Sequence, residues 1–188
     1  MRTLVIYAHP YDKSFNHFVF EKVQEIIKAK KNELDVIDLY KDNFDPVMRS
    51  SDLRVFSRGE YADKLAEDYA NRIAKADELV MVFPIWWYGE PAILKGFYDK
   101  VFLKGKAYHE VDHQLVGLLN IKKATILTTA TIDKEVFGYL GNPIENVLIK
   151  GTLAMVGVKN VEWIHCPTVF NEASRTNFLK EIEEHFKK

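Results

Sequence analysis

The chain has 188 residues, 47% of them hydrophobic and 28% charged, which is typical of one globular domain with a sizeable core, here residues 1–188. Its formal net charge of −1 excludes the strongly basic surface that binds nucleic acid or an anionic membrane. The single cysteine, Cys166, cannot form an internal disulfide. The sequence shows neither a signal-peptide pattern at its start nor a run of 18 apolar residues, so we expect a cytoplasmic protein.

Short apolar runs rich in β-branched residues alternate with longer amphipathic stretches, which is typical of βαβ units around a parallel sheet. The predicted strands are residues 3–8, 34–39, 78–83, 124–129 and 161–165. The predicted helices are residues 15–28, residues 61–76, a helix with Pro91 as its first residue, residues 142–156 and residues 174–186. The sequence therefore predicts an α/β fold in which helices cover both faces of a five-stranded parallel sheet.

Two segments do not fit this alternation. The connection from Tyr40 to Glu60 is longer than ordinary loops, and loops of this length are usually functional or disordered. Residues 109–113 read HEVDH, which has the H-E-x-x-H spacing of zinc proteases. Because Gly105 and Gly117 flank the motif and a third zinc ligand is not evident, we expect a solvated loop there and no metal site.

Three segments follow predicted strands, and ligands of open α/β sheets bind at the carboxyl ends of strands. The first is AHPYDKSFN, residues 8–16, where free N–H groups and the dipole of the first helix favour a phosphate. Ser14 adds a hydroxyl donor, and Asn16 could hold the loop or a ligand oxygen. Alternatively, Ser14 only caps the helix and His9 packs in the core.

The second segment is PIWWYG, residues 84–89, whose consecutive aromatic side chains cannot all share one face of a strand. Such rings stack well on planar conjugated ligands, although they could instead pack against the sheet or a neighbouring subunit. The third segment is LTTATID, residues 127–133, whose threonines can present hydroxyls and amides to a polar ring edge. Together the segments favour a flat ligand with a phosphate at one end, such as FMN or FAD, and the G-x-G-x-x-G and P-loop motifs are absent.

These segments resemble the flavodoxin-like NAD(P)H:quinone oxidoreductases, the group that contains DT-diaphorase and its shorter bacterial relatives. The most specific portion is FPIWWYGEPAILKGFYDKVF, residues 83–102, and NFDPVM is similar to the family's long loop after the second strand. The resemblance implies a flavodoxin-like three-layer sandwich and an NAD(P)H dehydrogenase (quinone) that uses FMN or FAD. In its ping-pong cycle, NADPH or NADH delivers a hydride to the flavin and is replaced by a quinone or similar acceptor.

The resemblance also implies site residues. The residues implied for the phosphate and ribityl chain are His9, Ser14, Phe15 and Asn16. Those implied for the isoalloxazine are Pro84, Ile85, Trp86, Trp87 and Tyr88. Those implied for its pyrimidine edge are Thr128, Thr129, Ala130 and Thr131. Backbone amides near residues 129–131 would stabilise negative charge on the flavin. Relatives commonly have TTGG where this chain has TTAT, so the two side chains narrow or tilt that loop. No catalytic side chain is evident, and Tyr139 lies nearby without an assigned role.

The family further implies a homodimer whose sites lie at the interface, near residues 40–60 and the helix after Pro91. Some bacterial relatives sit on potassium efflux systems, so the alternative is a regulatory flavoprotein subunit in peripheral association with such a protein. A single-electron carrier would need a strongly acidic surface, which the balanced charge disfavours. The residues leave open the physiological acceptor, the choice between NADH and NADPH, and the choice between FMN and FAD.

Overall fold

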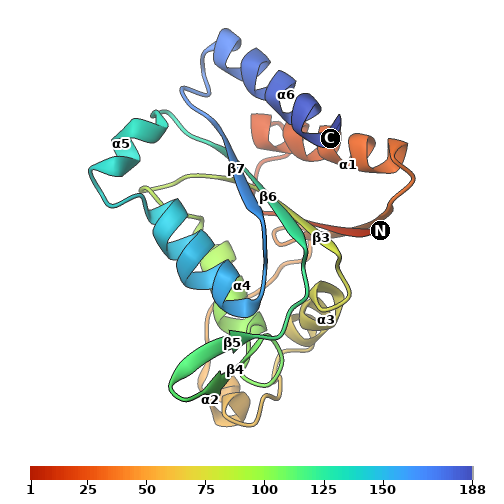
Figure 1. Ribbon diagram of the computed structural model, residues 1–188, viewed down its shortest axis with the longest axis vertical. Coiled ribbons are helices and arrows are strands. Elements are labelled where there is room, and N and C mark those ends of the chain that lie inside the picture. Colours follow the sequence, from red (N-terminus) through yellow and green to blue (C-terminus); the bar gives the residue numbers. More distant parts are fainter. Residues whose placement is uncertain (188) are drawn as a thin grey trace.

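The computed structural model describes residues 1–187. Five parallel strands form one sheet in the order β2-β1-β3-β6-β7 (Figure 1). Their bounds are Arg2–Tyr7 (β1), Glu33–Asp38 (β2), Glu78–Pro84 (β3), Lys123–Thr129 (β6) and Val161–Cys166 (β7). This order and the parallel pairing of every neighbour confirm the predicted flavodoxin-like α/β fold.

Helices cover both faces of the sheet (Figure 1). One face carries α1 (Phe15–Ala29) and α6 (Glu172–Lys187), and the other carries α3 (Lys64–Ile73), α4 (Ala92–Val101) and the helix η1 (Ile144–Leu153). The remaining elements are α2 (Ser50–Phe56), α5 (Lys134–Gly138), a 3₁₀ turn η2 (Ala154–Val156) and a hairpin of β4 (Tyr108–Val111) and β5 (Gln114–Gly117). The fold therefore has three layers, with the sheet in the middle.

The three central strands, β1, β3 and β6, are buried on both faces, which is why they read as continuous apolar runs. All seven residues of β3 are buried. In β1, Leu4 and Ile6 belong to the core under α3, α4 and η1, whereas Val5 and Tyr7 belong to the core under α1 and α6. This alternation fixes the sheet between its helices and brings the carboxyl ends of the strands together at one edge.

Helix boundaries depart from the predictions in several places, and α3, for example, is Lys64–Ile73 where residues 61–76 were predicted. Pro91 is the N-cap of α4, so the helix begins at Ala92, one residue after the predicted first helical residue. The predicted helix 142–156 exists, but Ile144–Leu153 has the wider turns of a π-helix. The five residues of α5 were not predicted, because so short a segment shows no readable helical period.

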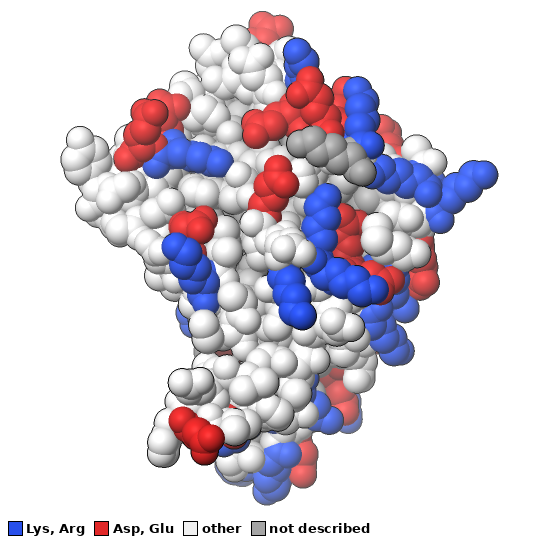
Figure 2. All heavy atoms as spheres, in the orientation of Figure 1, with Lys and Arg blue, Asp and Glu red and all other residues white. Residues whose placement is uncertain are grey.

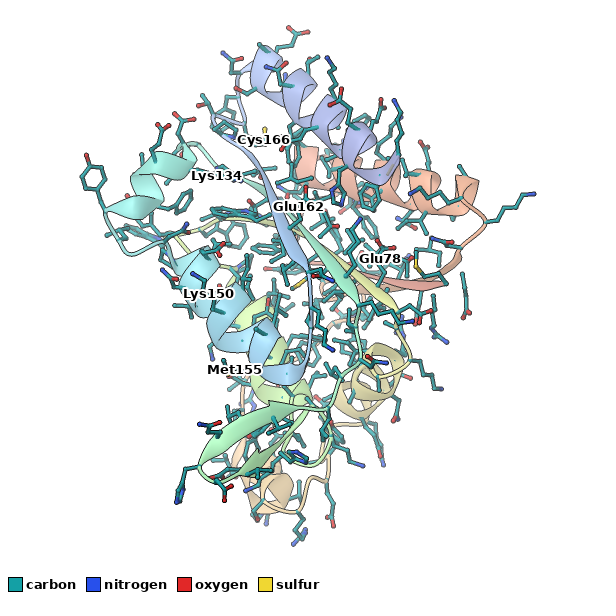
Figure 3. All side chains as sticks on the ribbon, in the orientation of Figure 1. Glu78, Lys134, Lys150, Met155, Glu162 and Cys166 are labelled. Carbon is teal, nitrogen blue, oxygen red and sulfur yellow. The ribbon has the colours of Figure 1, made fainter. Side chains whose placement is uncertain are left out.

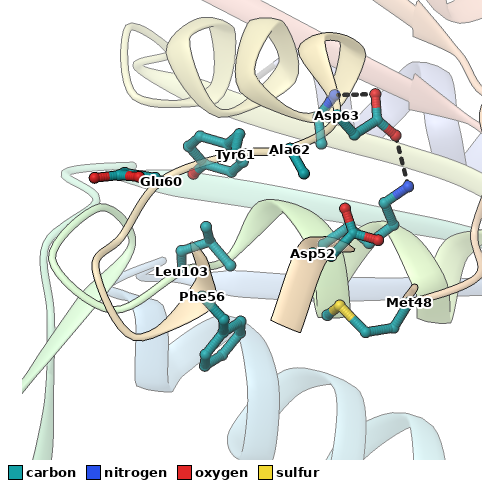
Figure 4. Close-up of a pocket in the computed structure, with 10 residues that line it drawn as sticks. Met48, Asp52, Phe56, Glu60, Tyr61, Ala62, Asp63 and Leu103 are labelled. Carbon is teal, nitrogen blue, oxygen red and sulfur yellow. Dashed lines mark hydrogen bonds and ion pairs between the residues drawn. The ribbon is translucent and has the colours of Figure 1, made fainter. Parts of the chain in front are cut away.

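The segment from Tyr40 to Glu60 is partly helical, since it contains α2, and two contacts attach it to α4. A Cβ on Gly96 would lie 2.2 Å from the carbonyl oxygen of Pro46, so only glycine permits this approach. Lys100 donates to the carbonyl oxygen of Asp45 at 2.9 Å and forms a buried ion pair of 2.5 Å with Asp63. Figure 4 shows this ion pair beside a pocket of about 10 Å³, which is too small to hold more than a water.

Residues 109–113 lie on the β4–β5 hairpin, so the expected solvated loop is a paired structure instead. His109 pairs with Val116, and Asp112 and His113 form the turn, with φ of 51° and 62°. The hairpin was missed because its strands have only four residues each. Within residues 1–187 no cluster of three metal-ligating side chains occurs, and no helix is long and apolar enough to cross a bilayer.

Candidate functional site

A cavity of about 800 Å³ lies at the carboxyl ends of β1, β3 and β6. The connection after β1 leads to α1 on one face of the sheet, whereas the connection after β3 leads to α4 on the other, and such a divergence opens a crevice. The lining residues are His9, Tyr11, Lys13, Ser14, Phe15, Asn16, Pro84, Ile85, Trp86, Trp87, Thr129, Ala130, Thr131, Val169, Phe170 and Arg175. Of the residues that the sequence predicted to bind the flavin, Tyr88 and Thr128 lie outside this lining.

One end of the cavity is built to receive an anion. Ser14 is the N-cap of α1, and its Oγ accepts a hydrogen bond from the N–H of His17 at 3.1 Å, so its hydroxyl proton stays free to be donated. The first N–H groups of the helix have no partner within it. Lys13 lines the same end, as does Arg175, whose guanidinium lies 5.8 Å over the ring of Phe15. Two cations and a helix N-terminus together favour a phosphate.

Asn16 joins the first segment to the third and leaves one polar atom without a partner. Its Nδ2 donates to the Oγ1 of Thr129 at 2.7 Å, and the residue is only 4% exposed. Its Oδ1 is buried and has no hydrogen-bond partner within the described part of the chain. A buried acceptor of this kind costs about 1 to 3 kcal/mol unless a donor reaches it. A hydroxyl-bearing ligand in the cavity would supply that donor, so the residues present fit the ribityl chain of a flavin.

His9 is a neutral donor beside the aromatic end. The N–H of Tyr11 donates to its Nδ1 at 3.1 Å, so Nδ1 is an acceptor and the proton of the neutral ring is on Nε2. Burial lowers the pKa of His9, which favours this neutral form. The imidazole lies 6.0 Å from the nearer ring of Trp86, between centroids. His9 therefore offers one N–H to a ligand.

The aromatic segment forms a two-residue turn after β3. Trp86 and Gly89 exchange both backbone hydrogen bonds, at 3.0 and 3.2 Å, while Trp87 and Tyr88 have φ of 50° and 67°. This left-handed backbone is rare for bulky residues and costs about 1 to 2 kcal/mol for each. The side chain of Trp87 is consequently 97% exposed and that of Trp86 43%, whereas Tyr88 packs edge-on against Phe137 with 6.1 Å between centroids. Two indoles thus line the cavity, and the third ring is half-buried and packs against the core.

The third segment differs most from its prediction. Thr128 is fully buried, and its hydroxyl is hydrogen-bonded inside the fold rather than toward the cavity. The N–H of Ala130 donates to the carbonyl oxygen of Cys166 at 3.1 Å, and its own carbonyl accepts from the N–H of Val169 at 2.8 Å. The Ala130 amide is therefore committed to the fold and cannot serve a ligand. Thr131, which lines the cavity and is exposed, can present its amide.

Comparisons with known proteins agree with this architecture. A family described as having a flavodoxin-like fold matches residues 1–188. An uncharacterised NAD(P)H oxidoreductase of Haemophilus influenzae is 32% identical over 87% of this chain and 82% of its own length. An FMN-dependent NADH:quinone oxidoreductase of Lachnoclostridium phytofermentans is 31% identical over 79% of this chain and 73% of its own length. The solved structure of an NAD(P)H:quinone oxidoreductase from Methanothermobacter marburgensis is similar with a TM-score of 0.90 and 28% identity, over 100% of this chain and 98% of that one.

The chain belongs to the flavodoxin-like NAD(P)H:quinone oxidoreductase family. In this family member, sequence reasoning missed five lining residues: Tyr11, Lys13, Val169, Phe170 and Arg175. Val169 and Phe170 follow β7, which neighbours β6, so extending the strand-end rule to the fifth strand would have found these two, whereas Arg175 lies further along the chain on α6. Tyr139, in contrast, is 92% exposed and lies outside the lining, and the geometry gives it no catalytic role.

Proposed function

We propose that the protein is a flavin-dependent NAD(P)H:quinone oxidoreductase that holds FMN in the cavity beside β1 and β3. The observation that carries this proposal is a single cavity of about 800 Å³ that extends from the anion-binding end at Ser14 to the indoles of Trp86 and Trp87. A ligand with a planar ring system and a phosphate tail suits both ends, because its rings can stack on the indoles and its phosphate can bind near Ser14. The printed name of the Lachnoclostridium relative, FMN-dependent NADH:quinone oxidoreductase, supports the same cofactor. FAD is the alternative, because the lining also includes Val169 and Phe170.

A bound flavin supplies the redox chemistry, the transfer of two electrons from NAD(P)H to a quinone or similar acceptor. The chain's own residues bind and orient it. The Ser14 hydroxyl and the first amides of α1 would hold the phosphate, and Asn16 Oδ1 would accept a hydrogen bond from a ribityl hydroxyl. The indoles of Trp86 and Trp87 stack on the rings and exclude water from them. The amide of Thr131 donates to the polar edge of the pyrimidine, where a fixed dipole stabilises negative charge.

We also propose that the protein works as a homodimer whose second copy covers the open side of the cavity. In one chain Trp87 is 97% exposed and Phe170 82%, so the substrate side is open to water. Figure 2 shows mostly uncharged surface where η1 meets the β4–β5 hairpin, and exposed apolar side chains there are Val111, Leu115, Val116, Val147 and Met155. Analytical ultracentrifugation at micromolar concentration should give twice the chain mass. A monomer under these conditions would contradict the dimer. The roles of residues 40–60 and α4 at its interface stay predictions.

Anaerobic absorption spectroscopy tests the proposed oxidoreductase activity. The purified protein should be yellow or should become so with FMN, and its flavin absorbance should bleach when NADH or NADPH is added and return when menadione follows. A bound flavin that stays oxidised under both nicotinamides would contradict the oxidoreductase. The mass of the released cofactor decides between FMN and FAD. The alternative, a regulatory subunit of a potassium efflux system, stays a prediction and would appear as copurification with membranes.

A further inference from the structure

A buried polar network lies directly behind the third segment of the cavity. Trp163 and His165 on β7 both reach Thr128 on β6: Trp163 Nε1 donates to Thr128 Oγ1 at 2.8 Å, and Thr128 Oγ1 lies 2.8 Å from His165 Nδ1. The other ring nitrogen, His165 Nε2, lies 2.9 Å from the carbonyl oxygen of Ile132. Figure 3 labels Lys134, two residues after Ile132, and Cys166, which follows His165 at the end of β7. The network thus connects β7 with the segment that follows β6.

The protons in this network have only one consistent arrangement. The carbonyl oxygen of Ile132 can only accept, so Nε2 of His165 carries a proton and donates it. Nδ1 of the neutral ring is then an acceptor, and the hydroxyl of Thr128 donates to it. The hydroxyl oxygen remains free to accept from Trp163, whose indole can only donate. Every group is satisfied only if His165 is neutral and protonated on Nε2. Burial lowers the pKa of His165, which favours the neutral form.

The turn at residues 130–132 is attached to the rest of the fold at both of its ends. Ala130 is fixed by hydrogen bonds to the carbonyl oxygen of Cys166 and from the N–H of Val169. Ile132 is fixed by His165. Thr131, which lies between the two fixed residues, lines the cavity and is exposed. Its N–H shares a planar peptide unit with the Ala130 carbonyl, so the bond from Val169 sets the direction of this amide, while the bond from His165 to Ile132 holds the other side of the turn in place.

Aromatic packing shields part of this network from water and joins it to the aromatic turn. Phe137 on α5 is fully buried, and its ring lies edge-on to Trp163 at 5.7 Å and to His165 at 5.6 Å, between centroids. Its ring also meets Tyr88, the one aromatic of the turn that points into the core. Hydrogen bonds in such a largely apolar setting are stronger than in water, and a broken one leaves an unpaired group.

We propose that His165 is a positioning residue that, through its Nε2–H bond to Ile132, holds in place the turn in which the Thr131 amide faces the pyrimidine edge of the bound flavin. The inference rests on the proposed function for the identity of the ligand and adds a residue that lies outside the cavity lining. His165 touches no ligand and transfers no proton. Its effect is to fix a donor before the ligand arrives, which tightens binding and favours the reduced, more negative flavin.

The test compares His165→Leu with Trp163→Phe. Both remove one N–H donor from the same network, but only His165→Leu breaks the bond to Ile132, so Trp163→Phe is the matched control. We expect His165→Leu to weaken FMN binding at least tenfold, against less than threefold for the control. The ratio of the affinities for reduced and oxidised flavin should fall about tenfold. For a two-electron couple this makes the reduction potential of the bound flavin about 30 mV more negative. His165→Gln, which can keep a donor toward Ile132, should recover most of both losses.

Two measurements without flavin complete the test. The imidazole ¹⁵N shifts of the wild-type apoprotein should identify the neutral ring protonated on Nε2, and amide hydrogen exchange at Thr131 and Ile132 should speed up in His165→Leu but not in Trp163→Phe. A ring protonated on Nδ1, or equal effects of the two variants on FMN binding and potential, would overturn the positioning role. If His165→Leu does not fold, the wild-type shifts and His165→Gln decide. Wild-type protein that binds no flavin would refute the proposed function instead, while exchange in the apoprotein still tests the attachment.

Discussion

Two tight turns of the molecule have the same left-handed backbone conformation but carry different side chains. The turn at the tip of the β4–β5 hairpin has φ of 51° at Asp112 and 62° at His113, and the turn after β3 has φ of 50° at Trp87 and 67° at Tyr88. Positive φ at both central residues suits a two-residue hairpin, for which Asn-Gly is the favoured sequence. Asp and His tolerate this backbone comparatively well, whereas bulky aromatic residues do not.

The difference indicates where the fold tolerates strain. At the hairpin tip, His113 is almost fully exposed and does not line the 800 Å³ cavity, and Asp and His fit the positive φ of this turn with little strain. At the cavity, the turn keeps Trp87 in a costly conformation although its ring is 97% exposed and gains almost no packing within the chain. Backbone strain that local packing does not repay is typical of binding sites. We infer that the ring of Trp87 is retained for a contact outside its own chain.

The largest expected effect comes from removing that ring. Trp87→Ala keeps a Cβ in the left-handed turn, so it leaves the strain and deletes only the stacking surface. FMN binding should weaken by about 1 to 3 kcal/mol, the usual contribution of an aromatic platform to a stacked base. Fluorescence titration of apoprotein with FMN measures this. The matched control is His113→Ala, which should bind FMN like the wild type, and an unchanged dissociation constant for Trp87→Ala would mean that the ring serves another purpose.

A smaller and opposite effect is expected on stability. Trp87→Asn puts a residue that tolerates positive φ into the strained position, and almost no buried surface is lost because the indole is exposed. The free energy of unfolding of the apoprotein should rise by about 1 kcal/mol, or roughly 2 to 4 °C in Tm. Calorimetry of Trp87→Asn beside Trp87→Ala separates strain from stacking, since both should lose FMN affinity and only the first should gain stability. Equal Tm values for the two variants would show that the turn is not strained by its side chain.

The sequence was sufficient for the sheet but not for the turns. Predicted and observed strands agree within two residues at each end, as with residues 3–8 against Arg2–Tyr7, and the central strands were the clearest because they are buried, largely apolar runs. The β4–β5 hairpin was missed since four-residue strands are too short to show an alternation. The conformation of Trp87 could not be read either, because the pairing of Trp86 with Gly89 imposes it.

The candidate site was predictable where a motif runs along the chain, and not where it depends on how distant segments meet. Ser14 and Asn16 follow from the start of a helix after a strand. Arg175 reaches the cavity only because α6 packs beside α1, which no local pattern announces. Thr128 has the same sequence signal as Thr129, yet it points away from the cavity because neighbouring residues of a strand face opposite sides.

The smallest effect is expected from the matching substitution in the β4–β5 hairpin turn. His113→Asn makes the same kind of exchange as Trp87→Asn, but the histidine already tolerates its backbone, and its contact with Glu110 at 3.6 Å is solvent-exposed and worth little. The free energy of unfolding should change by no more than about 0.5 kcal/mol, and FMN binding should not change at all. Calorimetry and FMN titration of both asparagine variants would then show a gain confined to the cavity turn. If His113→Asn stabilised the protein as much as Trp87→Asn, positive φ alone would explain both gains. The argument that the strain at Trp87 marks a binding surface would then lose its basis, whatever the flavin does.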